Sequence, residues 1–254
     1  MKISEVIEII EQYAPIEIAD DGDRVKVGLQ LGSRNPECTG VVTCLDATLD
    51  VIKLAVENGC NMVVSHHPLI YYPLQKVDAD EVHGEVVAYA LKNDVTVYSA
   101  HTNFDKCEIG TNASLVKMFG GKTIETNGCC FLCEIEPTTV RDFALKIATV
   151  LNDKSVKVAG NPDKLVNKFA VCSGGGGGAY SFLEYAEKNA DVYVSGDMPH
   201  HIYLEAVNRD FACIEFSHYA SEIMAEDVFK SILENKVKVI KANQLCPFRT
   251  LEEL

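Results

Sequence analysis

The chain alternates between short apolar runs rich in β-branched residues and longer segments in which apolar residues recur every three or four positions. The first long segment has an apolar face from Ile3 to Ile10, acidic residues opposite, and a stop at Pro15, so it predicts an amphipathic helix. A turn is predicted at Asp20–Asp23. Strands are then predicted at 27–31, 41–46, 61–65 and 95–100, and helices at 49–56 and 85–92. Strands that alternate with helices indicate a mostly parallel sheet with helices on both faces.

The alternation of strand-like and helix-like segments continues in the second half of the chain. It is interrupted around Gly120-Gly121 and Asn127-Gly128, where turn residues break the pattern. We expect a boundary at this interruption between two lobes, residues 1–125 and 126–254, which together make one module. Strands are predicted at 129–135, 156–159, 168–173, 191–196, 211–216 and 237–240, with helical segments between several of them. The predicted fold class is therefore α/β, with two lobes that each hold a mostly parallel sheet flanked by helices.

Composition narrows the class of protein. With 254 residues, 47% hydrophobic and 24% charged, the chain has the composition of a soluble globular protein. Its formal net charge of −14 argues against nucleic acid as a partner, because phosphate binding needs clustered Lys and Arg. No apolar run approaches membrane-spanning length, and the early acidic residues do not fit a signal peptide. We expect a cytoplasmic protein that does not contact a membrane.

Ten cysteines in such a protein are expected to be reduced and to serve as small buried side chains. The segment from Cys129 to Cys133 contains a C-x-x-C spacing, which is also found in structural metal sites. It lacks a second matching pair of ligands, and its neighbours have the pattern of a strand. We therefore interpret it as part of a strand rather than as a zinc or iron–sulfur site.

A candidate site appears where the strand predicted at 61–65 ends in His66-His67-Pro68. Neighbouring side chains of a regular strand point to opposite sides, so two adjacent histidines serve one site only where the strand has ended and the chain turns. Pro68 enforces such a turn by fixing its own φ. A buried strand that ends in histidines is typical of a metal or proton-transfer site, although for a lone His-His pair a satisfied loop histidine beside an exposed one is the more common explanation.

The remaining histidines favour the metal interpretation. Two strand ends carry a carboxylate four residues after a histidine, His101 with Asp105 and His218 with Glu222, a spacing that places both side chains on one face of a helix. The carboxyl ends of parallel strands share one edge of a sheet. Nitrogen and oxygen ligands from three such ends suit two metal ions bridged by a carboxylate. Six of the seven histidines stand at or just after a predicted strand end: His66, His67, His101, His200, His201 and His218. Only His83 stands apart, at an expected solvated helix start.

These motifs closely resemble the Nif-three-like dinuclear metal centre family, whose members are also called GTP cyclohydrolase 1 type 2 homologues. The resemblance rests on His66-His67-Pro68, then His101-Thr-Asn-Phe-Asp105, then His218-x-x-x-Glu222, and it covers nearly the whole chain. It includes Val27-Gly-Leu-Gln and the segment from Ser195 to His201. The long insert that some relatives carry between the two halves is absent, so the chain resembles the short form.

The resemblance implies the Nif-three-like fold and a set of site residues. The implied metal ligands are His66, His67, Asp105, His218 and Glu222, with Glu222 the candidate bridge between the ions. His101 lies beside the site as a further ligand or as a catalytic proton-transfer group. The resemblance also implies two divalent metal ions per chain and a homohexameric ring whose metal centres face its interior. Imidazole and carboxylate suit Zn, Fe, Mn, Co or Ni, and the sequence does not choose among them.

Four further residues and one glycine run are weaker candidates. Asp197, His200 and His201 are candidates for substrate or outer-water contacts; alternatively Asp197 begins a helix and the two imidazoles face solvent. Asp46 either orients a ligand histidine or caps the following helix. The run from Gly174 to Gly178 lies where backbone N–H groups can cradle a phosphate, but it lacks the Lys-Ser/Thr of a P-loop, and a tight turn is the alternative.

Two functions remain open from the sequence. The first is a metal-dependent hydrolase, in which two divalent ions lower the pKa of a shared water and His101 transfers protons. The family name implies GTP as substrate, with water attacking C8 of the guanine ring, although phosphoester or other nucleotide hydrolysis suits the same metals. The second is a hexameric metal-binding scaffold that interacts with other proteins without catalytic turnover. The first needs an open coordination position, whereas the second has closed sites.

Overall fold

The computed structural model describes residues 1–251 and divides the chain into two compact units. Unit 1 comprises Met1–Gly110 and Ile223–Leu245, and unit 2 comprises Thr111–Glu222 with the C-terminal residues from Cys246 onward. The sequence predicts one division, between residues 125 and 126, whereas the structure divides the chain after Gly110 and again after Glu222. The difference arises because the last helix and strand return to the first sheet, a long-range pairing that local patterns do not encode.

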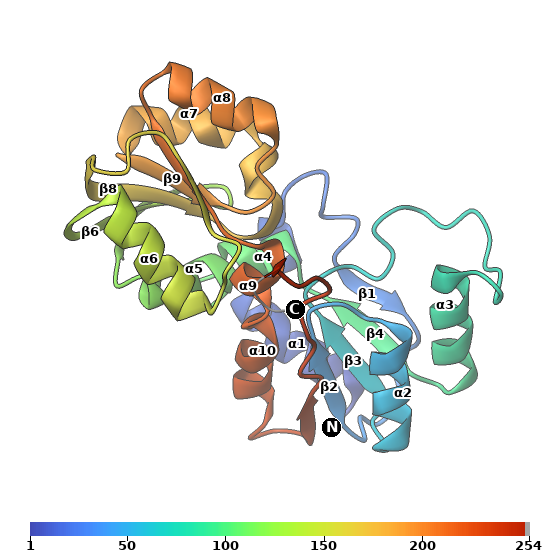
Figure 1. Ribbon diagram of the computed structural model, residues 1–254. Coiled ribbons are helices and arrows are strands. Elements are labelled where there is room, and N and C mark those ends of the chain that lie inside the picture. Colours follow the sequence, from blue (N-terminus) through green and yellow to red (C-terminus); the bar gives the residue numbers. More distant parts are fainter. Residues whose placement is uncertain (252–254) are drawn as a thin grey trace. The chain divides into compact units, whose positions relative to one another are not determined.

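Unit 1 is built on a five-stranded sheet in the order β1-β4-β3-β2-β11. The strands β2, β3, β4 and β11 run parallel, and β1 pairs antiparallel with β4 at the edge. Figure 1 shows α1 and α10 on one face of this sheet and α2 and α3 on the other. The strands are β1 Gly28–Leu31, β2 Val41–Cys44, β3 Met62–Ser65, β4 Thr96–Ser99 and β11 Val239–Lys241. The helices are α1 Ile3–Tyr13, η1 Ile16–Ile18, α2 Leu49–Glu57, α3 Val82–Lys92, α4 Thr102–Lys106 and α10 Ala225–Leu233.

The two faces of this sheet each bury one set of strand side chains. Because successive side chains point to opposite faces, Val41 packs toward α1 and α10, whereas Val42 packs toward α2 and α3. The apolar face of α1 is fully buried, as its spacing predicts. On the same side, the rings of Phe104 and Phe229 lie 4.3 Å apart, which fixes α10 beside α4. The predicted parallel sheet with helices on both faces is confirmed for unit 1.

Unit 2 contains a six-stranded sheet in the order β5-β6-β8-β9-β10-β7. Its central strands β8, β9 and β10 are parallel, and antiparallel strands flank them on both sides. In Figure 1, α7 and α8 cover one face, and α5 and α6 cover the other. The strands are β5 Lys122–Asn127, β6 Cys130–Thr139, β7 Lys157–Ala159, β8 Leu165–Cys172, β9 Val192–Ser195 and β10 Ala212–Glu215. The helices are α5 Thr111–Met118, α6 Val140–Leu151, η2 Gly174–Gly178, α7 Tyr180–Asn189, α8 His200–Asn208 and α9 His218–Glu222.

Three elements of unit 2 differ from the sequence-based expectation. The sequence predicts turn residues without a strand around 120–128, whereas the structure has the strand β5 there. All six residues of β5 are exposed, so they show no alternation of apolar and polar positions. The helix α5 is also absent from the prediction, and the sequence gives α8 only as an alternative, through a helix beginning at Asp197. Each buries only two apolar side chains, Leu115 and Val116 in α5 and Ile202 and Ala206 in α8, so neither has a broad apolar stripe.

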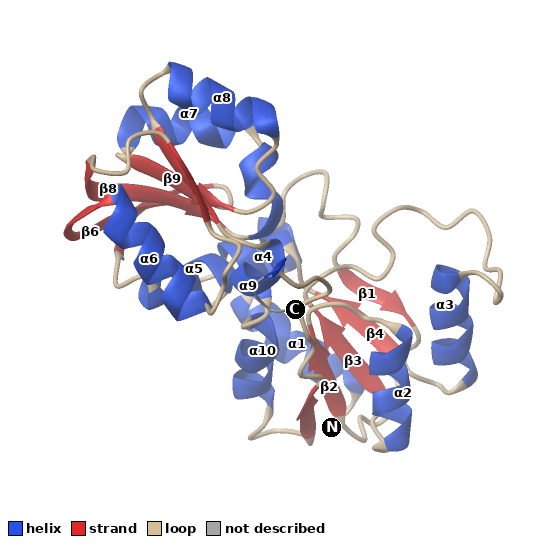
Figure 2. Ribbon diagram, viewed as in Figure 1, coloured by secondary structure: helices blue, strands red, loops and turns tan. Residues whose placement is uncertain are grey.

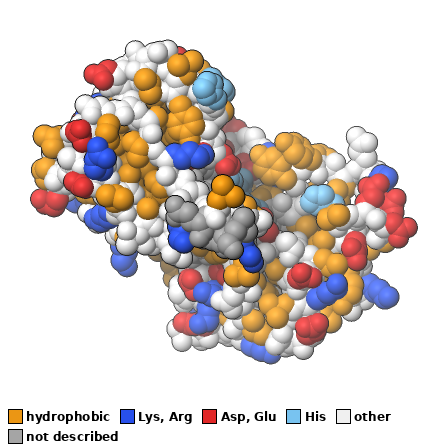
Figure 3. All heavy atoms as spheres, viewed as in Figure 1, with side chains coloured by type: hydrophobic (Ala, Val, Ile, Leu, Met, Phe, Trp, Pro, Cys, Tyr) orange, Lys and Arg blue, Asp and Glu red, His pale blue; other side chains and the backbone are white. Residues whose placement is uncertain are grey.

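Besides the two sheets, the molecule is characterised by the long connection in unit 1, its charged surface and the length of its helices. Residues 66–81 join β3 to α3 without helix or strand (Figure 2). On the face shown in Figure 3, the Lys and Arg side chains in view are scattered among acidic ones. Among the described residues, each helix is too short or too polar to cross a membrane. In unit 1, the parallel strands β2, β3 and β4 end at one edge of the sheet, and in unit 2 the parallel strands β8, β9 and β10 do the same. Ligands commonly bind at such an edge, so the candidate site residues are found there.

Candidate metal centre

Three histidines of unit 1 meet at the carboxyl ends of two neighbouring parallel strands. His66 and His67 follow β3, and His101 follows β4; the register pairs Ser65 with Ser99, so both strands end at the same level. Ring centroids of His66 lie 5.2 Å from those of His67 and 5.3 Å from those of His101. One ring nitrogen of each histidine lies within 4.8 Å of the others. The three imidazoles are thus close enough to share a metal ion.

A carboxylate of the next helix faces the same cluster. His101 is the residue before α4, and the backbone N–H of Asp105 donates to the carbonyl oxygen of His101 at 2.9 Å. This single helical turn brings Asp105 back to the strand ends, where its Oδ1 lies 3.5 Å from Nε2 of His66. Both side chains are buried. The predicted one-face relation of His101 and Asp105 is therefore present, on a helix of five residues.

Each of these imidazoles is held in a defined orientation through Nδ1. In His66, Nδ1 lies 2.9 Å from the carbonyl oxygen of Ala100. In His67, Nδ1 lies 2.8 Å from Oδ1 of Asp46. A carbonyl or carboxylate oxygen accepts a hydrogen bond, so each Nδ1 carries the proton and Nε2 keeps its lone pair. This is the arrangement by which proteins orient metal-binding histidines.

Asp23 orients the imidazole of His101 through Nδ1 in the same way. It is a site residue that the sequence analysis did not identify. Its Oδ2 accepts hydrogen bonds from Nδ1 of His101 at 2.8 Å and from the hydroxyl of Thr102 at 2.7 Å. Burial by itself would raise the pKa of Asp23, but the hydrogen bonds from His101 and Thr102 outweigh it and lower that pKa to about 2. The sequence offered only a turn rich in Asp as a signal. Asp23 is thus a buried carboxylate, ionised at neutral pH, behind His101.

Unit 2 contains a second donor set on α9. His218 and Glu222 are the first and last residues of this helix, and Nε2 of His218 lies 2.9 Å from Oε2 of Glu222. Nδ1 of His218 lies 2.7 Å from Oδ2 of Asp197, which follows β9. The pattern of unit 1 is therefore repeated here, with Nδ1 bound to a carboxylate and Nε2 beside a second one.

The glycine run adjoins this second set. Gly174 has a φ of +58°, and a Cβ atom at this position would lie 2.1 Å from Oε1 of Glu222 and 3.1 Å from Nε2 of His218. Its N–H donates to the hydroxyl of Ser221 at 3.0 Å. The run forms the short helix η2 between β8 and α7, which is the tight-turn alternative of the two considered from the sequence. A side chain at Gly174 is incompatible with the position of Glu222.

His200 and His201 are the first two residues of α8, and both side chains are exposed. The ring of His201 stacks on Tyr180 with centroids 5.5 Å apart. Of the four tentative residues, Asp46 and Asp197 thus contact histidines directly, whereas the substrate contact suggested for His200 and His201 stays a prediction.

The C-x-x-C segment is part of a strand. Cys130 and Cys133 lie in β6, both side chains are buried, and all ten cysteines are free thiols. Burial raises the pKa of each of these two thiols to about 12, so neither is a thiolate at neutral pH. The interpretation of this segment as part of a strand is confirmed.

The chain is similar to known proteins over nearly its whole length. The family model described as Duf34/NIF3 (NGG1p interacting factor 3) matches residues 1–247. A GTP cyclohydrolase 1 type 2 homolog from Clostridium acetobutylicum is 29% identical over 96% of this chain and 93% of its own length. The protein of the same name from Methanocaldococcus jannaschii is 32% identical over 93% of this chain and 96% of its own length. The crystal structure of Staphylococcus aureus protein SA1388 superimposes with a TM-score of 0.89 at 26% identity, covering 99% of both chains.

Proposed function

The chain belongs to the Duf34/NIF3 family, and from this premise we propose that it is a dinuclear metal-dependent hydrolase. The observation that carries the proposal is shared by four histidines, His66, His67, His101 and His218. In each of them an oxygen acceptor lies within hydrogen-bond distance of Nδ1, which leaves Nε2 as a metal-binding atom beside other nitrogen or oxygen donors. Isolated structural histidines have no need for this common orientation.

We assign His66, His67, Asp105, His218 and Glu222 as the ligands of two divalent ions. Imidazole and carboxylate together suit Zn, Fe, Mn, Co or Ni. When bound, two such ions would lower the pKa of water toward neutrality and polarise the substrate.

His101 is the proposed proton-transfer residue, with a role as further ligand as the alternative. Its Nδ1 proton is donated to the ionised Asp23, so a proton taken from water would go to Nε2. The resulting imidazolium would be stabilised by the negative charge of Asp23. The buried carboxylate also prevents the ring from turning, so Nε2 keeps facing His66 and His67.

Nucleotides are the first substrates to test, because the two curated relatives are named GTP cyclohydrolase 1 type 2 homologs. Protein loaded in turn with Mn, Zn, Fe, Co or Ni is expected to hydrolyse GTP or another member of a nucleotide panel. Asp105→Asn should reduce turnover to background, whereas the exposed Glu8→Gln in the same unit should not change it. Absence of turnover with every metal and nucleotide would contradict the hydrolase and favour the interaction scaffold.

A prediction about Asp23 separates the two roles of His101. We expect Asp23→Asn to lower kcat/KM about 10–100-fold, because a neutral amide no longer stabilises a protonated imidazole. If His101 transfers protons, metal content stays constant while the pH profile of kcat changes; if His101 is a ligand, metal affinity falls instead. The exposed Asp21→Asn is the control. Unchanged kinetics and unchanged metal affinity in Asp23→Asn would contradict both roles.

The homohexamer implied by the family resemblance is part of the proposal. Light scattering coupled to size-exclusion chromatography is expected to give about six times the 27.9 kDa chain mass. A monomeric mass would contradict the ring.

A further inference from the structure

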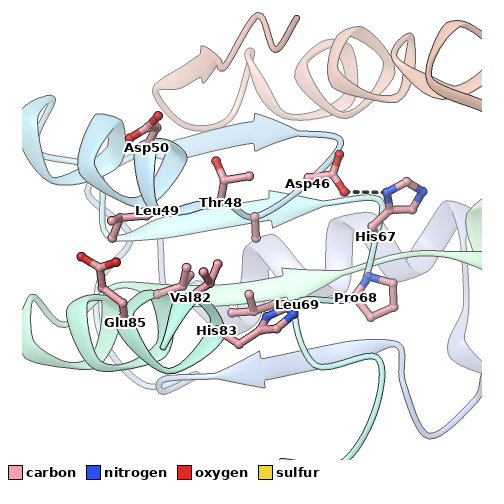
Figure 4. A pocket seen from close by; sticks show the side chains of 12 residues that line it. Asp46, Thr48, Leu49, Asp50, His67, Pro68, Leu69, Val82, His83 and Glu85 are labelled. Carbon is pink, nitrogen blue, oxygen red and sulfur yellow. Dashed lines mark hydrogen bonds and ion pairs between the residues drawn. The ribbon is translucent and has the colours of Figure 1, made fainter. Parts of the chain in front are cut away.

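A cavity of about 410 Å³ lies in unit 1 where α2 and α3 begin (Figure 4). Its lining includes Asp46 and His67, whose hydrogen bond is drawn in Figure 4, and the buried side chains of Leu69 and Val86. A cavity of this size is within the range of small-molecule sites. We name it the α2–α3 pocket. A molecule held here lies next to His67, which is one of the proposed metal ligands, so the inference rests on the proposed function.

The charge of the α2–α3 pocket argues against a phosphate group as its occupant. Its acidic lining residues are Asp46, Asp50 and Glu85, and among the described residues no Lys or Arg lines it. Two helices begin at the pocket, and helix N-termini attract anions, but each of these helices already carries an acidic residue in its first turn, Asp50 in α2 and Glu85 in α3. A phosphate placed here would meet these carboxylates without a counter-charge.

The same lining suits a flat ring with N–H donors. Leu69 and Val86 provide apolar surface at 9% and 5% exposure, which can pack against the faces of a ring. Within the described part of the chain, the carboxylates of Asp50 and Glu85 have no hydrogen bond or ion pair with protein groups, so they can accept from a ligand. Asp46, in contrast, is occupied by His67.

His83, the one histidine that the sequence sets apart, contributes a further polar group. It is exposed on the first turn of α3. It lines both the α2–α3 pocket and a second cavity of about 570 Å³, whose lining includes Tyr71 and Tyr72 of the segment 66–81. Its imidazole can donate or accept at the boundary between the two cavities. A ring that fills the first cavity would thus meet acceptors at one side and His83 at another.

We propose that the α2–α3 pocket is the specificity site of the hydrolase and that it binds an uncharged nitrogen heterocycle bearing N–H donors, with any phosphate of the substrate outside the pocket. Such a ring packs on Leu69 and Val86 and donates to Glu85 and Asp50. Next to His67, it would bring a reactive atom of the ring or of its attached group to the proposed metal ligands.

Calorimetric titration with guanosine and with inorganic tripolyphosphate tests the proposal on the full-length protein, both metal-loaded and chelator-treated. Guanosine is expected to bind in both states, and Glu85→Gln and Asp50→Asn should each weaken it about tenfold, since a hydrogen bond to a charged group is lost. Glu57→Gln at the far end of α2 is the matched control and should bind guanosine as the unmodified protein does. Tripolyphosphate is expected not to compete with guanosine.

The results of these titrations distinguish the specificity site from the hydrolase activity. Guanosine binding that is absent in both states, unaffected by both substitutions, or displaced by tripolyphosphate would overturn the specificity site. Guanosine binding that depends on Glu85 and Asp50, in a protein that hydrolyses nothing, would support the site while contradicting the hydrolase.

Discussion

Protein purified without chelator or nickel affinity is expected to carry about two divalent metal ions per chain, and His66→Ala and Glu222→Gln are each expected to lose most of this metal. His66 is fully buried with its Nδ1 bound to the carbonyl of Ala100, so the substitution removes an imidazole that no other residue can replace. Glu222 lies 2.9 Å from Nε2 of His218, and its amide replacement loses the negative charge that a cation requires. Elemental analysis of the three proteins gives the ratio directly.

His83→Ala is the control for this experiment, because it removes an exposed imidazole that lies outside the histidine cluster. It should keep the full metal content. Little or no metal in the unmodified protein, also after reconstitution, would contradict the metal centre and would leave the interaction scaffold as the better hypothesis. Full metal in both His66→Ala and Glu222→Gln would show that metal binds elsewhere.

The histidines were predictable because their positions depend on where strands end. An apolar run followed by His-His-Pro marks both the end of β3 and the start of a turn, and the pattern before His101 marks the end of β4 in the same way. Once a parallel sheet is inferred, its topology brings such strand ends to one edge without further information. The grouping of His66, His67 and His101 in unit 1 follows from this reasoning.

Asp23 was not predictable by the same reasoning. It lies in an irregular turn, 78 residues from His101 along the chain, and its contact with that residue depends on how η1 and the following loop fold against α4. No periodicity encodes such a contact. The return of residues 223–245 to unit 1 has the same origin, since the pairing of β11 with β2 joins segments at opposite ends of the sequence.

The glycine run shows a third limit of sequence reasoning. Five consecutive glycines suggest either a phosphate cradle or a tight turn, and both interpretations concern the backbone of the run itself. The structure gives Gly174 a different importance, namely the absence of a side chain next to Glu222 and His218. A requirement set by a neighbour 48 residues away does not appear in a local pattern.

This closeness leads to the second prediction, that Gly174→Ala removes most of the bound metal although it leaves every proposed ligand in place. The new Cβ would lie 2.1 Å from Oε1 of Glu222, a distance that non-bonded atoms do not tolerate, so the carboxylate has to move. The backbone adds to the effect, because a φ of +58° costs a residue with a side chain about 1–2 kcal/mol. We expect a metal content as low as that of Glu222→Gln, together with a lower melting temperature.

Gly178→Ala in the same run is the matched control, since a Cβ there meets nothing within 4 Å and the φ of Gly178 is not in the left-handed region. It should keep both the metal and the thermal stability of the unmodified protein. The double variant Gly174→Ala/Glu222→Gln tests the cause: if Gly174 acts through Glu222, the two losses of metal affinity do not add, because contacting residues are coupled. Additive losses would place the effect of Gly174 on His218 or on the backbone of α9 instead, and full metal content in Gly174→Ala would contradict the assignment of Glu222 as a ligand.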